Sequence, residues 1–152
     1  MKVAFVKPPV GGILGLEMLT FVEPLGPICV AACLEAEGHE CKVYDLRIDG
    51  EEHGLALCRK FAPDVVGLQC NFTTERNRTV RLAQRIKREN PGTFVVVGGH
   101  DASRDPNWFN DDVIDAVAVG DGEEVMPAMV DAIQRGHDLA TVPGLMLHRE
   151  GR

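Results

Sequence analysis

The stretch Phe94-Val95-Val96-Val97-Gly98-Gly99-His100 decides the fold class of this chain. Its first four residues are apolar at every position, and two glycines and a histidine follow them directly. A run that is apolar at every position fits a strand buried on both faces, which is typical of a parallel sheet with helices on both sides. The paired glycines then permit a tight turn at the end of that strand.

The same pattern of short apolar runs separated by helical segments recurs along the whole chain. The other predicted strands are Val3–Val6, Cys41–Asp45, Asp64–Cys70 and Asp115–Val119. The predicted helices are Ile28–Glu37, Glu51–Phe61, Glu75–Glu89 and Glu123–Arg135, with a short element near Asn107–Asn110. Five βα repeats predict an α/β fold with a doubly wound, flavodoxin-like or Rossmann-like parallel sheet of five strands in the order 2-1-3-4-5. Residues 141–149 fit an extra edge strand at the C-terminal end.

Composition narrows the classes of function. The 152 residues are 45% hydrophobic and 26% charged, which is typical of one globular domain, and the net charge is −7. An acidic chain argues against binding to nucleic acid or to an anionic membrane. No apolar run approaches the roughly 18 residues that span a bilayer, and no signal peptide is evident, so we expect a cytoplasmic protein. The five cysteines are an odd number and are expected to be free thiols.

Three glycine-rich segments follow predicted strands and therefore meet at one edge of the sheet. They are residues 11–15, 98–99 and 120–122. Ligands of open α/β sheets bind outside the carboxyl ends of the strands, so these loops predict a ligand site. The usual phosphate-binding motif G-x-G-x-x-G is absent, because Val125 stands where the motif needs its third glycine. The carboxylates of Asp121 and Glu123 would also repel a phosphate.

A series of short motifs, in order, resembles a known family. The motifs are Lys7-Pro8-Pro9, Pro24-Leu25-Gly26-Pro27, Leu34-Glu35-Ala36-Glu37-Gly38-His39-Glu40, Pro63-Asp64-Val65-Val66-Gly67-Leu68, Val95-Val96-Val97-Gly98-Gly99-His100, and residues 115–123. Together they resemble the N-terminal cobalamin-binding domain of cobalamin-dependent radical S-adenosylmethionine enzymes, over nearly the whole chain. The resemblance implies that the corrin ring lies across the carboxyl edge and that the nucleotide tail runs down beside the sheet.

The resemblance also implies a set of cofactor-binding residues, and no catalytic or metal-ligating residue. The set is Pro9, Gly11, Gly12, Asn71, Thr73, Thr74, Gly98, Gly99, His100, Gly120, Gly122 and Glu123. Other cobalamin domains carry D-x-H-x-x-G after the first strand, where the histidine ligates cobalt. Here Lys7 replaces the aspartate, Pro9 replaces the histidine and Gly12 matches the glycine. We therefore predict no histidine below the cobalt, and expect residues 71–76 to approach the lower face of the corrin.

The chain lacks the C-x-x-x-C-x-x-C motif of radical enzymes. Cys29 and Cys33 lie four residues apart on an alanine-rich helix, where packing is the favoured interpretation. The resemblance thus implies that a 4Fe-4S cluster and S-adenosylmethionine belong to a missing catalytic domain of the same parent chain. Residues 1–140 are expected to form the cobalamin domain, and residues 141–152 to lead toward that catalytic domain.

Two other functions stay open at this point. One is a flavodoxin-like module that binds a flavin or a nucleotide. The other is a protein-interaction domain without a small-molecule ligand, which would act through the basic face of the third predicted helix. That face carries Arg76, Arg78, Arg81, Arg85, Lys87 and Arg88, and we expect it to be solvated.

Overall fold

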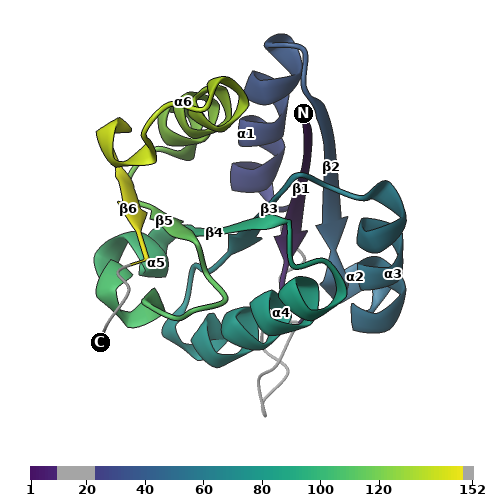
Figure 1. Cartoon of the computed structure of the whole chain (residues 1–152). Coiled ribbons are helices and arrows are strands. Elements are labelled where there is room, and N and C mark those ends of the chain that lie inside the picture. Colours follow the sequence, from purple (N-terminus) through teal and green to yellow (C-terminus); the bar gives the residue numbers. More distant parts are fainter. Residues whose placement is uncertain (10–22, 149–152) are drawn as a thin grey trace.

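The computed structural model describes residues 1–9 and 23–148. Within them one six-stranded sheet has the order β2-β1-β3-β4-β5-β6 (Figure 1). The strands are β1 (Lys2–Lys7), β2 (Glu40–Asp45), β3 (Val65–Gln69), β4 (Phe94–Gly98), β5 (Ala116–Ala118) and β6 (Leu145–Leu147). The neighbouring pairs among β1 to β5 are all parallel, which confirms the predicted order. The extra edge strand is also confirmed, as β6, and it pairs antiparallel with β5.

Helices cover both faces of this sheet. They are α1 (Leu25–Ala36), α2 (Leu46–Asp49), α3 (Glu51–Phe61), α4 (Arg76–Glu89), α5 (His100–Arg104) and α6 (Gly122–Arg135), with 3-10 turns η2 (Thr73–Glu75), η3 (Pro106–Phe109) and η4 (Leu139–Thr141). Helices α1 and α6 lie together on one face, and α3 and α4 lie on the other (Figure 1). Each face buries its own apolar core, as a doubly wound sheet requires.

The helix boundaries differ from the predicted ones where local chemistry outweighs periodicity. Helix α1 begins at Leu25 rather than Ile28. Pro27 fits its first turn because the first N–H groups of a helix have no intrahelical partner. The four-residue α2 and the five-residue α5 were not predicted, since such short segments show no helical period.

Half of the six residues on the basic face of α4 are paired with acidic groups. The Nη1 atom of Arg85 lies 2.6 Å from the Oε1 atom of Glu51 in α3. The Nζ atom of Lys87 lies 2.6 Å from the Oδ2 atom of Asp115, just before β5. Arg76 is buried against α5. The prediction of a solvated basic face is therefore wrong for these three side chains, because acidic residues far away in the sequence face them.

The cysteines divide into two environments. Cys41, Cys58 and Cys70 are buried, and burial raises the pKa of each thiol to about 11. Cys29 is exposed and Cys33 is half-buried, so the prediction that this pair packs into the core is wrong for Cys29. All five are free thiols, as expected. Across residues 1–9 and 23–148, no helix combines the length and the apolar character needed to cross a membrane.

Candidate cofactor-binding site

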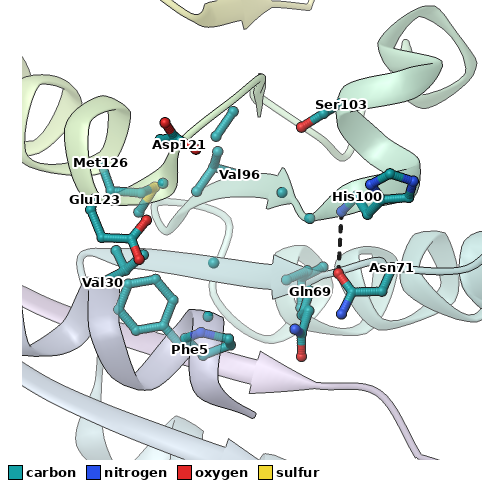
Figure 2. Close-up of a pocket in the computed structure, with 18 of the residues that line it drawn as sticks. Phe5, Val30, Gln69, Asn71, Val96, His100, Ser103, Asp121, Glu123 and Met126 are labelled. Carbon is teal, nitrogen blue, oxygen red and sulfur yellow. Dashed lines mark hydrogen bonds between the residues drawn. The ribbon is translucent and has the colours of Figure 1, made fainter.

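A cavity of about 460 Å³ opens at the carboxyl end of the sheet, on the face covered by α1 and α6. Its floor includes Phe5 of β1 and Val96 of β4, and its walls include Val30 of α1 and Met126 of α6 (Figure 2). Gly67 of β3 also lines it. These groups make the interior apolar. The cavity therefore fits a flat or elongated apolar group that enters between the two helices.

The floor of the cavity depends on a glycine. A Cβ atom at Gly67 would lie 2.7 Å from Cδ1 and 2.9 Å from Cε1 of Phe5. The aromatic ring thus rests directly on the backbone of β3. Any side chain at position 67 would displace the ring and reshape the floor of the cavity.

Gln69, the last residue of β3, places a polar group in this apolar setting (Figure 2). Its Oε1 atom is buried and accepts no hydrogen bond from the described residues. Its Nε2 atom lies 3.8 Å from the position of a Cβ atom built on Gly26 of α1. A buried carbonyl without a donor is destabilising by about 1–3 kcal/mol, and a ligand with an N–H or O–H group would relieve this cost if the Gln69 amide turns toward the cavity.

One side of the cavity mouth is formed by the loops after β3 and β4. The backbone N–H of His100 donates to the Oδ1 atom of Asn71 at 3.2 Å (Figure 2). Gly99 has a φ of +112°, and a Cβ atom there would lie 2.6 Å from Asn71 Oδ1 and 2.7 Å from the carbonyl oxygen of Cys70. Only glycine permits this contact between the two loops. The exposed imidazole of His100 consequently stands at the mouth.

The other side of the mouth is formed where β5 leads into α6. A Cβ atom at Gly122 would lie 2.9 Å from Cγ2 of Val30, so the glycine allows α6 to approach α1 closely. The exposed Asp121 and Glu123 also line the mouth (Figure 2). Two carboxylates at this position favour ligand groups that donate hydrogen bonds, such as amides and hydroxyls, over anionic groups.

A buried acid fixes the loop after β3 to α5. Asp101 of α5 forms ion pairs with Arg76 and Arg104, and it accepts a hydrogen bond from the hydroxyl of Thr73 at 2.8 Å. The bond from Arg76 is the main cause that holds the pKa of Asp101 well below its usual range. The segments on one side of the mouth are thus joined by charge as well as by backbone contacts.

Most residues of the predicted set come together at the cavity. Those that line it are Asn71, Gly98, Gly99, His100, Gly120, Gly122 and Glu123. Pro9, Thr73 and Thr74 are not among the lining residues. The carbonyl of Pro9 accepts a hydrogen bond from Arg78 at 2.7 Å, and Thr74 is exposed. Gly11 and Gly12 lie outside the described residues.

The residues that line the interior of the cavity were not among the predicted site residues. Phe5, Val30 and Met126 carry an apolar pattern that also fits an ordinary core, so nothing in the sequence separates them from core residues. Gln69 did carry a signal, because it is the one amide side chain in the predicted strand Asp64–Cys70. A polar residue near the carboxyl end of a buried strand is a reasonable candidate for a ligand contact.

Comparison with known proteins identifies the family of this chain. A model of the B12-binding domain matches residues 11–130. The chain belongs to the B12-binding domain family. The predicted resemblance to a cobalamin-binding domain is thereby confirmed, and cobalamin is the cofactor of this family.

Relatives of this B12-binding domain include much longer proteins. The chain is 30% identical over 149 residues to hopanoid C-3 methylase of Methylococcus capsulatus, which covers 96% of this chain and 28% of the methylase. It is 31% identical over 156 residues to the uncharacterized methyltransferase PH0819 of Pyrococcus horikoshii, covering 100% of this chain and 34% of that protein. The chain therefore spans only about a third of these relatives or less.

The fold of the B12-binding domain matches a solved structure. The cobalamin-dependent S-adenosylmethionine radical enzyme OxsB, solved with aqua-cobalamin bound, superimposes with a TM-score of 0.78 at 17% sequence identity. The match covers 98% of this chain and 21% of the OxsB chain.

The residues of the cavity fit a corrinoid. Cobalamin carries carboxamide and hydroxyl groups that donate hydrogen bonds, and the buried Oε1 atom of Gln69 needs such a donor. Its nucleotide tail needs room beside the sheet, and the missing side chain at Gly67 provides some of it by letting the Phe5 ring lie directly on β3. Among the described residues, no three His, Cys, Asp or Glu side chains converge as a metal site.

Proposed function

We propose that this chain is the cobalamin-carrying part of a cytoplasmic radical S-adenosylmethionine methylase. The named relatives are a methylase and a methyltransferase about three times as long, which supports a catalytic domain in the same polypeptide. That domain would hold the 4Fe-4S cluster and S-adenosylmethionine. Residues 1–140 would supply every element that faces the cofactor, and residues 141–152 would lead toward the catalytic domain.

The cavity would hold the nucleotide tail of cobalamin, with the corrin lying over the carboxyl ends of the strands. The observation that carries this proposal is the cavity at that edge, which combines an apolar floor, the unpaired carbonyl of Gln69 and hydrogen-bonding side chains at its mouth. Bound cobalamin would supply a cobalt centre that accepts and donates a methyl group. The task of the protein is then to hold the tail, to orient the ring and to keep water from its buried side.

Each predicted binding residue has a role in this proposal. Gly98, Gly99, Gly120 and Gly122 would let the backbone approach the cofactor, while Asn71, His100 and Glu123 would meet its amide and hydroxyl groups at the mouth. Thr73 and Thr74, after β3, would approach the lower face of the corrin. Pro9, Gly11 and Gly12 stay predicted cofactor-binding residues, and the two glycines lie outside the described residues. Proline has no group that ligates a metal, so we expect no histidine-type lower ligand from the segment after β1.

The proposal is tested by adding hydroxocobalamin to the purified chain, desalting it and recording the visible spectrum. We expect corrin absorbance to stay with the protein at micromolar concentration. A protein that loses all corrin absorbance, or that retains a flavin or a nucleotide under the same treatment, contradicts the proposal. Pre-loading with each of these competitors before adding cobalamin separates the alternatives.

A pair of variants links the result to the cavity. Gln69→Leu removes the buried amide with little change in volume, so it should weaken cobalamin binding about fivefold, which corresponds to one hydrogen bond of about 1 kcal/mol. The same substitution should leave the ligand-free protein as stable as before or more so, because no unpaired carbonyl remains. Gln84→Leu on the exposed face of α4 is the matched control, and it should leave the affinity unchanged.

A further inference from the structure

A buried ion pair lies at the carboxyl edge of the sheet. The Nζ atom of Lys7, the last residue of β1, lies 2.7 Å from the Oε1 atom of Glu75, and both side chains are only 9% exposed. A buried ion pair does not by itself stabilise a fold, because removing two charges from water offsets their attraction. The pair therefore calls for a role besides stability.

The second carboxylate oxygen of Glu75 shows that role. Its Oε2 atom accepts the backbone N–H of Asn71 at 2.7 Å and that of Phe72 at 3.2 Å. One side chain thus joins the end of β1 to the second and third residues after β3. Without Glu75 these two N–H groups lose their acceptor, and the loop loses its connection to β1.

The connection continues to the mouth of the cavity. The side chain of Asn71, whose backbone Glu75 holds, accepts the N–H of His100 at 3.2 Å and packs against Gly99. Lys7, Glu75, Asn71 and His100 therefore form one continuous polar chain across the carboxyl ends of β1, β3 and β4. Two of its members, Asn71 and His100, line the cavity, and the other two do not.

We propose that Lys7 and Glu75 are a positioning pair that fixes Asn71 and His100 against the bound cobalamin. This inference rests on the proposed function. Lys7 stands where other cobalamin domains carry the aspartate of D-x-H-x-x-G. Position 9, where those domains carry the histidine, is Pro9 here, so Lys7 has no imidazole to orient. In this chain the residue instead orients the loop after β3.

The inference is tested with two double variants that remove both charges together. Lys7→Met with Glu75→Gln, the acceptor-retaining variant, keeps a side-chain carbonyl that can accept the two loop N–H groups. Lys7→Met with Glu75→Leu, the acceptor-free variant, has a similar volume and no acceptor. Measurements are the Kd for hydroxocobalamin, the visible spectrum of the complex, the Tm, and hydrogen exchange of the amides of Asn71, Phe72 and His100.

A second ion pair of the same kind, at the amino ends of β4 and β5, provides a control. Lys87 pairs with Asp115 at 2.6 Å, and the same carboxylate oxygen accepts the N–H of Val95 at 2.6 Å. Lys87→Met with Asp115→Leu removes that pair and its acceptor, and neither residue lines the cavity. It should change the Kd for cobalamin less than threefold, whatever its effect on the Tm.

We expect the acceptor-free variant to bind cobalamin at least tenfold more weakly, with a changed visible spectrum and faster exchange at Asn71 and His100. The acceptor-retaining variant should stay within threefold of the original affinity. Should the acceptor-free variant not fold, Asn71→Ala breaks the next link of the chain while leaving the ion pair intact, and it should weaken binding at least fivefold and expose the amide of His100.

The inference is overturned if the folded acceptor-free variant, or Asn71→Ala in its place, keeps the original affinity, spectrum and exchange rates. It is also overturned if the acceptor-retaining variant loses as much affinity as the acceptor-free variant. Failure of the unaltered chain to bind cobalamin is a different result, since it contradicts the proposed function. Hydrogen exchange can be measured without the cofactor. Equal protection of these amides in the two double variants would therefore overturn the positioning role even if the unaltered chain did not bind cobalamin.

Discussion

Among glycine-to-alanine substitutions at the carboxyl edge of the sheet, Gly99→Ala should disrupt the mouth of the cavity most. Its backbone has φ +112° and ψ 177°, a conformation that L residues with a side chain rarely adopt. The added Cβ atom would lie 2.6 Å from Asn71 Oδ1 and 2.7 Å from the carbonyl oxygen of Cys70. The second contact is to backbone at the end of β3, which cannot rotate out of the way as a side chain can.

The magnitude follows from two separate effects. Forcing a non-glycine residue into this backbone conformation costs about 1–3 kcal/mol. Displacing the packed loop after β3 adds a similar amount, about 1–3 kcal/mol, as for other overpacked sites. The free energy of unfolding should therefore fall by about 4 kcal/mol, and for a domain of this size that corresponds to a Tm lower by about 8–16 °C.

Gly120→Ala provides the comparison that isolates the contact. Gly120 also has a positive φ, +96°, but no atom lies within 4 Å of a Cβ atom built there. This variant should lose only the conformational part, about 2 kcal/mol. Urea unfolding followed by circular dichroism measures both free energies. If the two variants lose the same free energy, the reasoning from the contact with Asn71 and Cys70 is refuted.

Three further outcomes are expected. Because the folded-state pKa of Asp101 lies below its usual value, its contribution to stability is present above about pH 4 and is lost as the pH falls further. Asp101→Asn should lower the Tm at pH 7 and flatten the decrease of Tm between about pH 4 and pH 2; an unchanged slope in thermal scans would contradict this. At pH 8 a colorimetric thiol reagent should label Cys29 and Cys33 quickly and the three buried cysteines only after unfolding. Rapid labelling of all five would show that the other three are not buried. Gly67→Val should push the ring of Phe5 into the cavity and weaken retention of cobalamin at least tenfold by equilibrium dialysis, so normal retention by a folded variant would exclude this floor as the tail site.

The parallel strands could be predicted from the sequence because each depends on a local pattern, and their order followed from the doubly wound fold class that five βα repeats indicate. Buried strands such as Phe94–Gly98 are apolar on both faces, and the glycines that follow them mark the edge where loops gather. The same signals predicted Gly99 and Gly122 as site residues, and both line the cavity. Local composition was sufficient wherever a single strand and its turn determine the outcome.

Features that depend on distant residues could not be predicted in this way. The sequence shows Arg76 as one of six basic residues on a helix, and only the position of α5 reveals that it is buried against Asp101. The unpaired oxygen of Gln69 is likewise a property of everything packed around it. Lys7 has a lysine's usual preference for the surface, and its burial becomes evident only when Glu75 lies opposite.

The two outer strands of the sheet also bear on self-association. An exposed strand edge invites pairing with another copy of the chain, and proteins prevent this with very short edge strands or with charged side chains. Here one edge is β6, which is three residues long, and the other is β2, where Glu40 and Lys42 are exposed. Neither edge offers a long apolar template, so extension of the sheet from one molecule into the next is disfavoured even at high protein concentration.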